Sequence, residues 1–262
     1  MNWREENSLS HSIQFLKRGG LPRAQVRCVV ASAQEPKITH ALQTRGIEVL
    51  HPCACGQLLG PEQHHADLLL RHLGGEEVLL APGQTKLAHS LQQHGGRPIF
   101  IDRPLCAEYP HNVGLNALLC GSVLLARLDS AAPELLAMAR HRGWRTHYVR
   151  QGYAGCASAL VSENAIMTAD RGIAQAAGQE GIDCLLLTPG HIRCDGFDTG
   201  FIGGCCGKLS PTVLAFAGDP ECHPDAQRMQ RFCQRHGVDL AALAEGELCD
   251  IGGIVPILEE EK

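Results

Sequence analysis

Cys249 is the side chain best placed to act as a nucleophile, because it stands beside Asp250 in an apolar segment near the C-terminus, residues 248–257. A cysteine attacks an electrophilic carbon as the thiolate, so it needs a neighbour that lowers its pKa or accepts its proton. His65 and Asp67 form a His-x-Asp pair, and histidine can transfer protons near neutral pH. Cys249, His65 and Asp67 are therefore the predicted catalytic residues.

Other polar side chains and thiols stand in loops between the apolar segments, where binding residues are common. Carboxylates suit a planar cation, which prefers two parallel hydrogen bonds. Amides can bind a ligand or a loop backbone, but they supply no negative charge. A loop thiol could also replace Cys249 as the reactive group. The predicted ligand-binding residues are Asn112, Asn116, Cys156, Asp198, Cys205 and Asp250.

Several of these residues also fit a purely structural role. The Asp-Gly and Asp-Thr-Gly sequences within 195–200 are ordinary turn sequences. The glycines around Cys205 and Cys206 permit tight turns as well as the close approach of a ligand. Lys208 and Arg193 are interpreted as solvated surface residues.

The chain has 13 cysteines and 14 histidines. An odd number of cysteines without a secretory segment indicates reduced thiols rather than a disulfide framework. The spacings Cys-x-Cys and Cys-Cys differ from the two-residue spacing of common zinc sites. We therefore predict no metal ligands and no cofactor. A thiol or metal-binding protein that uses Cys53, Cys55, Cys205 and Cys206 stays open as an alternative.

The composition argues against several kinds of partner. The formal net charge is −5, whereas non-specific nucleic-acid binding requires a basic face. No apolar stretch approaches the ~20 residues of a membrane span, and the polar start MNWREENSLS lacks a secretory apolar region. We expect a cytoplasmic protein without a nucleic-acid or membrane partner. The sequence does not indicate an oligomeric state.

A unit of about 45 residues recurs along the chain, and such a period is typical of solenoids, propellers and arrays. Each unit reads as a strand, a turn, a short apolar strand, a helix and a further strand. The second strands are predicted at 27–32, 78–83, 123–127, 165–170 and 213–219. Glycines that suit a left-handed helix end follow at Gly46, Gly95, Gly143, Gly181 and Gly237. The predicted fold class is α/β, a closed ring of five ββαβ-type units.

The two ends of the chain complete this prediction. Residues 1–22 read as an N-terminal arm or a short helix, so the first unit lacks a preceding strand. The apolar segment 248–257 could pair beside the N-terminal strand and close the ring, which protects the sheet edges. We predict one domain over residues 23–258, followed by a solvated acidic tail, 259–262.

Some segments are distinctive beyond the repeat. They are His65-Ala66-Asp67, the loop segments 109–116, 151–156 and 195–204, and the ending 250–256. Together with the fivefold repeat and the closing strand, these segments resemble the pentein or α/β-propeller fold of the guanidino-group-modifying enzymes. Over about residues 45–258, the chain resembles most closely an uncharacterised bacterial branch of that superfamily.

The resemblance implies a central channel, lined by the loops that open each unit, which binds a small molecule. In those enzymes a cysteine near the C-terminus attacks the guanidino carbon, and a histidine and acidic residues assist. Cys249, His65 and the acidic residues would take these roles here. When the chain is aligned on Pro256, however, the nucleophile position falls on Gly252. The His-x-Asp pair also stands in the second unit, whereas the enzymes have it in the third.

Two functions follow as alternatives to the thiol or metal-binding protein. One is a cysteine-dependent hydrolase or transferase that acts on a small guanidino or amidino compound, which requires a thiol and a histidine to converge in space. The other is a non-catalytic ring that binds a small ligand or a protein, as a ribosome anti-association initiation factor with this fold does.

Overall fold

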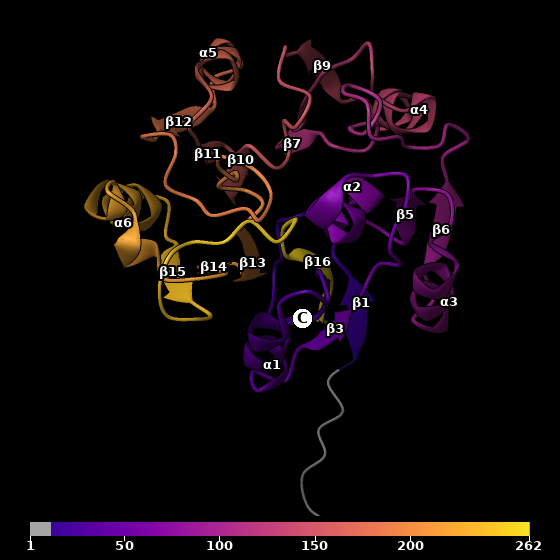
Figure 1. The fold of residues 1–262 in the computed structure, drawn as a ribbon, viewed down its shortest axis with the longest axis horizontal. Helices are drawn as coiled ribbons and strands as arrows, with labels where there is room; N and C mark the ends of the chain where they lie inside the picture. The colour runs from indigo at the N-terminus through magenta and orange to yellow at the C-terminus, as the bar shows by residue number, and fades with distance from the viewer. Residues whose placement is uncertain (1–11, 262) are drawn as a thin grey trace, which may run out of the picture.

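The structure is a computed structural model that describes residues 12–261, and five small sheets surround a common centre in it (Figure 1). Four of the sheets have three strands, and each comes from one sequence unit. In the second unit, β4 (Leu70–His72) is antiparallel to β5 (Glu77–Leu80), and α3 (Thr85–Gln93) leads to the parallel strand β6 (Arg97–Phe100). The predicted ββαβ unit is therefore confirmed.

The next three units repeat this order of elements. The third comprises β7 (Leu118–Cys120), β8 (Val123–Ala126), α4 (Pro133–His141) and β9 (Arg145–Tyr148). The fourth comprises β10 (Ser158–Ser162), β11 (Ala165–Thr168), α5 (Arg171–Gln179) and β12 (Asp183–Leu186). The fifth comprises β13 (Cys206–Ser210), β14 (Val213–Phe216), a 3-10 helix η2 (Pro220–Cys222), α6 (Ala226–Arg235) and β15 (Asp239–Ala242).

Each unit's long helix lies at the periphery of the ring and is followed by a glycine with positive φ (Figure 1). These glycines have φ values of 67–83°, a left-handed conformation that only glycine adopts without strain. They are the five glycines predicted to end the helices: Gly46, Gly95, Gly143, Gly181 and Gly237.

The first unit takes its antiparallel strand from the end of the chain. Its own elements are β2 (Val26–Val30), α1 (Pro36–Gln43) and β3 (Glu48–Leu50). The C-terminal strand β16 (Val255–Glu260) pairs antiparallel with β2. The predicted pairing of the C-terminal segment beside the N-terminal strand is thus confirmed.

Both predicted terminal segments need correction. The N-terminal arm contributes strand β1 (Ile13–Phe15), which pairs with β16; residues 1–11 of the arm lie outside the described residues. Glu259 is not solvated: it is 0% exposed, and its carboxylate accepts hydrogen bonds from the backbone amides of Arg23 and Ala24. The free amides of the incoming arm need an acceptor there, so the acidic end belongs to the ring.

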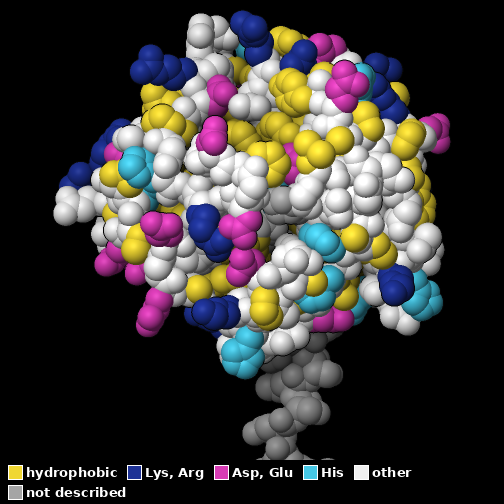
Figure 2. All heavy atoms as spheres, viewed as in Figure 1, with side chains coloured by type: hydrophobic (Ala, Val, Ile, Leu, Met, Phe, Trp, Pro, Cys, Tyr) yellow, Lys and Arg dark blue, Asp and Glu magenta, His cyan; other side chains and the backbone are white. Residues whose placement is uncertain are grey.

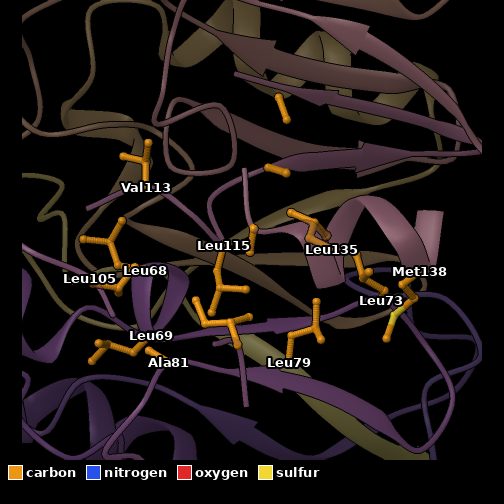
Figure 3. Packing of buried hydrophobic residues seen from close by; sticks show 14 of the residues in the cluster. Leu68, Leu69, Leu73, Leu79, Ala81, Leu105, Val113, Leu115, Leu135 and Met138 are labelled. Carbon is orange, nitrogen blue, oxygen red and sulfur yellow. The ribbon is translucent and has the colours of Figure 1, made fainter. Parts of the chain in front are cut away.

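Apolar side chains fill the spaces between neighbouring units. Figure 3 shows Leu69 and Leu79 of the second unit packed against Leu115 and Leu135 of the third. Because each seam is built from two units, the ring is stabilised as a whole. Within residues 12–261, no helix is both long enough and apolar enough to cross a bilayer.

Candidate functional site

The loop that opens the second unit places three titratable side chains at the centre of the ring. A 3-10 helix η1 (Gly60–His64) and a one-turn helix α2 (Ala66–Leu69) hold Glu62, His65 and Asp67, which are each 5–6% exposed. The backbone amide of Asp67 donates to the carbonyl of Gly252 at 2.9 Å. This bond fixes the loop against the C-terminal segment.

The thiol of Cys156 lies between Asp67 and Asn116. Its S–H donates to Oδ2 of Asp67 at 2.8 Å, and Nδ2 of Asn116 donates to its sulfur at 2.8 Å. The oxygen of the same Asn116 amide accepts from the backbone amides of Gly155 and Cys156, at 2.8 and 3.2 Å. Asn116 therefore both shapes the loop and orients the thiol.

Asp250 holds the opposite side of this cluster. Its carboxylate accepts from the backbone amides of Phe201 at 2.8 Å and Gly252 at 3.0 Å, and it lies 3.9 Å from Nδ1 of His65. A β-carbon on Gly204 would come within 2.6 Å of Oδ2 of Asp250, so this carboxylate fits only against a glycine. The Gly-Gly segment before Cys205 serves this close approach.

Glu62 and Tyr153 form a second polar pair nearby. The Tyr153 hydroxyl donates to Glu62 at 2.7 Å, and the Asn112 amide contacts both groups. Burial and the neighbouring carboxylate raise the pKa of Tyr153 well above its usual value, so the phenol stays neutral. The Tyr153 ring stacks between Tyr109 and Phe201, with centroid distances of 5.8 and 5.5 Å.

Several of these groups line a cavity of roughly 190 Å³, which we call the acidic cavity. Its volume suits a small molecule rather than a drug-sized one. Figure 2 shows a few acidic side chains near the middle of one face of the molecule, next to a basic side chain and below a group of hydrophobic ones. The cavity is lined by Glu62, His65, Tyr153, Cys156, Cys194, Phe197, Thr199, Gly200, Phe201 and Asp250.

The buried carboxylates control the ionisation of the site. Burial, with a further contribution from Asp250, raises the pKa of Asp67 to about 6, although His65 partly opposes this shift. Burial and the carboxylates of Asp67 and Asp250 raise the pKa of Cys156 well above its usual value. Without a ligand, the site therefore holds a neutral thiol facing negative charge.

A second cavity, of roughly 100 Å³, lies on the other side of Asp67; we call it the basic cavity. Arg71 and Lys208 line it, and burial lowers their pKa values to about 10 and about 8. Lys208 is therefore not solvated as expected: its ammonium donates to two backbone carbonyls at 2.8 Å. Three buried polar atoms of residues that line the basic cavity have no hydrogen-bond partner among the described residues: Asp67 Oδ1, Arg71 Nε and Ser158 Oγ.

Cys249, the predicted nucleophile, lies outside the acidic cavity. It borders a separate cleft of roughly 40 Å³, where an Arg193 guanidinium nitrogen is 3.1 Å from its sulfur. Burial raises its pKa to about 11 despite Arg193. His65 also borders this cleft, but no hydrogen bond joins it to Cys249 within residues 12–261.

Asp67, Asn112 and Asn116 are not in the lining of the acidic cavity, but they hydrogen-bond to residues that are. Two further predicted residues lie apart from the cavity. Asp198 is exposed. Cys205 is fully buried in the core and donates to the carbonyl of Ile202 at 3.1 Å. The sequence around Asp198 also fits a turn, and that around Cys205 also fits a tightly packed segment. The structure places Asp198 at the surface and Cys205 in the core.

Gly252 shows why the C-terminal segment supplies no nucleophile beside the histidine. Its φ is +77°, and a β-carbon there would lie 2.5 Å from Cγ of His65. Position 252, where alignment on Pro256 predicts the nucleophile, therefore has no space for a side chain. Its backbone instead binds Asp67 and Asp250.

The sequence did not indicate Glu62, Tyr153 and Arg71, which line the two cavities. Glu62 precedes His65 by three residues and Tyr153 precedes Cys156 by three, so each stands in a loop already singled out for another residue. The proximity of Glu62 to Tyr153 depends on the ring, because the two residues are 91 positions apart.

The solved structures most similar to this chain include three enzymes. The amidinotransferase SxtG from Microseira wollei, of the saxitoxin biosynthetic pathway, has a TM-score of 0.55 at 10% identity, covering 87% of this chain and 91% of its own. DDAH from Pseudomonas aeruginosa, a mutant complexed with citrulline, has a TM-score of 0.51 at 10% identity, covering 89% and 99%. The inosamine-phosphate amidinotransferase StrB1 from Streptomyces griseus has a TM-score of 0.54 at 12% identity, covering 92% and 94%.

Identities this low establish the fold alone. With five ββαβ units around a common centre and a C-terminal strand that pairs with the first unit, the chain is a pentein-fold protein, as the sequence predicted. It belongs to the family of unknown function DUF6873, which matches residues 29–255. No curated protein matches the sequence.

Proposed function

We propose that this protein is a cysteine-dependent hydrolase or transferase that binds a small guanidino or amidino compound in the acidic cavity, with Cys156 as the nucleophile. The observation that carries this proposal is the 2.8 Å contact of Cys156 with the carboxylate of Asp67, because Cys156 lines the acidic cavity together with His65. The fold is shared with two amidinotransferases and with DDAH, which was solved with citrulline bound.

A bound planar cation would change the ionisation of this cluster. Glu62 and Asp250 offer carboxylate oxygens to a guanidinium or amidinium. A positive charge beside the sulfur would oppose the effect of the carboxylates and lower the pKa of Cys156. The ligand would thus activate the thiol that attacks it.

The reaction would proceed through an amidino group bonded to the sulfur of Cys156. Cys156 Sγ bonds to the amidino carbon as its proton passes to Asp67 Oδ2, and the pKa of about 6 makes Asp67 a better base than an ordinary aspartate. The carbon–nitrogen bond to the leaving amine breaks as that nitrogen takes a proton from His65. The oxygen of water, or the nitrogen of a second amine, then bonds to the amidino carbon and passes a proton to His65. The carbon–sulfur bond breaks, and Cys156 Sγ takes back its proton from Asp67.

Binding without chemistry is the second candidate. It is favoured by the elevated pKa values of Cys156 and Cys249 and by the absence of a side chain at Gly252. The same carboxylates would bind the cation, but the thiol would stay protonated.

The test uses 2-chloroacetamidine, an amidinium that alkylates thiols, against the neutral iodoacetamide. Intact-protein and peptide mass spectrometry would locate the labels in the native protein and in Cys156→Ser and Cys249→Ser, with exposed Cys222 as the internal reference. We expect chloroacetamidine to modify Cys156 in preference to Cys222, and iodoacetamide to show the reverse. Unlabelled guanidinium that protects Cys156 would show that a cation occupies the cavity.

The outcomes separate the two candidates. Preferential labelling at Cys156 that Cys249→Ser retains supports the enzyme. Saturable binding of guanidinium or arginine, measured by calorimetry, with no labelling at Cys156, supports binding alone. Failure of every cation to bind would overturn both.

A further inference from the structure

One cluster of possible metal ligands lies away from both cavities, at the seam between the first two units. Cys28 is on β2, Glu48 is on β3, and His94 caps the C-terminus of α3. Their ligand atoms all lie within 4.8 Å of one another, which no other group of three such side chains achieves in the described part of the chain. The four cysteines of the predicted thiol or metal site are not among them.

The backbone fixes two of these residues as neighbours. Cys28 and Glu48 are directly paired in the parallel register of β2 and β3, so their side chains point to the same face of the sheet. Helix α3 of the second unit packs on that face, where Leu87 and Leu91 join the same apolar cluster as Cys28. The end of α3 therefore brings His94 to the two strand residues.

The polar contacts at this seam leave the sulfur available. Nε2 of His94 lies 3.1 Å from a Glu48 carboxylate oxygen, close to the separation of adjacent ligands around tetrahedral zinc. The Cys28 thiol is almost fully buried, and its hydrogen-bond acceptor is a backbone carbonyl at 3.9 Å. Glu48 is half exposed, so an ion and a water ligand can enter from solvent.

We propose that Cys28, Glu48 and His94 bind a zinc ion that joins the first unit of the ring to the second. Thiolate, imidazole and carboxylate are the ligands zinc prefers, and the charges of Cys28 and Glu48 would neutralise the ion. Water would complete a four-coordinate site. The ion would stabilise the seam, because the ligands come from β2 and β3 on one side and from α3 on the other.

Cobalt(II) is the probe for this site, because thiolate ligation gives a near-ultraviolet charge-transfer band that oxygen and nitrogen ligands do not give. Metal-free protein would be titrated with cobalt, followed by displacement with zinc. We expect one ion per chain and a zinc-dependent rise in Tm. Cys28→Ser should abolish the band, and His94→Gln, a change of a partly exposed residue, should weaken binding about 10-fold to 100-fold.

Matched controls are Cys222→Ser and His89→Gln, which alter an exposed cysteine and another histidine of α3. Both should retain the band and the affinity of the unmodified protein. A band that survives Cys28→Ser would overturn the proposal, as would equal affinities of His94→Gln and His89→Gln. Absence of the band in the unmodified protein would do so as well.

Discussion

The backbone of Gly252 packs directly against the imidazole of His65, where a β-carbon would lie 2.5 Å from Cγ. The histidine therefore faces the peptide backbone of the C-terminal segment. The same residue binds Asp67 through its carbonyl and Asp250 through its amide. The C-terminal segment thus positions the side chains that surround the proposed nucleophile, Cys156.

Gly252→Ala should be far more destabilising than Gly253→Ala. Both glycines have φ close to +78°, so alanine would be strained at either position, but a β-carbon on Gly253 would lie no closer than 3.5 Å to any neighbour. We expect Gly253→Ala to lower the free energy of unfolding by about 1 kcal/mol. Gly252→Ala should lower it by several kcal/mol or prevent folding, because the backbone and the imidazole ring of His65 must move. Urea unfolding would measure the difference; equal losses would contradict the packing described.

Asp67→Asn should stabilise the protein above pH 6. Ordinary aspartate has a pKa of about 3.9, whereas that of Asp67 is about 6. Between these values the folded chain holds a proton that the unfolded chain has released, so stability falls as pH rises and the loss is complete above pH 6. Asparagine removes this loss and can still accept from Cys156.

The expected gain for Asp67→Asn is on the order of 1–3 kcal/mol at pH 8, vanishing near pH 4. Thermal unfolding at several pH values would measure it, with Asp198→Asn as a control that changes an exposed carboxylate. Lower stability of Asp67→Asn at every pH would show that the ionised carboxylate is stabilising.

Glu62→Gln should weaken the binding of a guanidinium or amidinium about 10-fold or more, since it removes one charge while preserving an acceptor for Tyr153. Binding of neutral urea should change little. Calorimetry with both ligands would test this expectation, and Asp198→Asn should bind the cation like the unmodified protein. A parallel loss for cation and urea would indicate a change of cavity shape instead.

Glu259→Ala should destabilise the protein by about 2–3 kcal/mol, because two backbone amides of the N-terminal arm would lose a charged acceptor. Glu260→Ala removes a partly exposed ion pair with Arg27 and should cost less than about 1 kcal/mol. Chemical unfolding of the two variants would compare them. Similar losses would mean that Glu259 does not hold the arm.

The units of the fold were predictable because their signals are local. An apolar strand, an amphipathic helix and a glycine that can adopt positive φ determine each unit within about 45 residues. The apolar pattern of residues 248–257 also predicted a C-terminal strand beside β2, and the structure has it at β16 (Val255–Glu260). Neither β1 nor the burial of Glu259 could be predicted locally. Both depend on contacts between the N-terminal arm and the end of the chain, where the backbone of the arm needs an acceptor.

The site was predictable only in part, for the same physical reason. The sequence identified His65, Asp67, Cys156 and Asp250 as reactive types in loops, and the structure brings these four together. It could not choose between thiols, because Cys156 and Asp67 are 89 positions apart and meet only when the ring closes. Residue types and local conformation were determined by the sequence itself. Which thiol faces which carboxylate was decided by the tertiary structure, because burial and charge at that contact arise only when distant units pack.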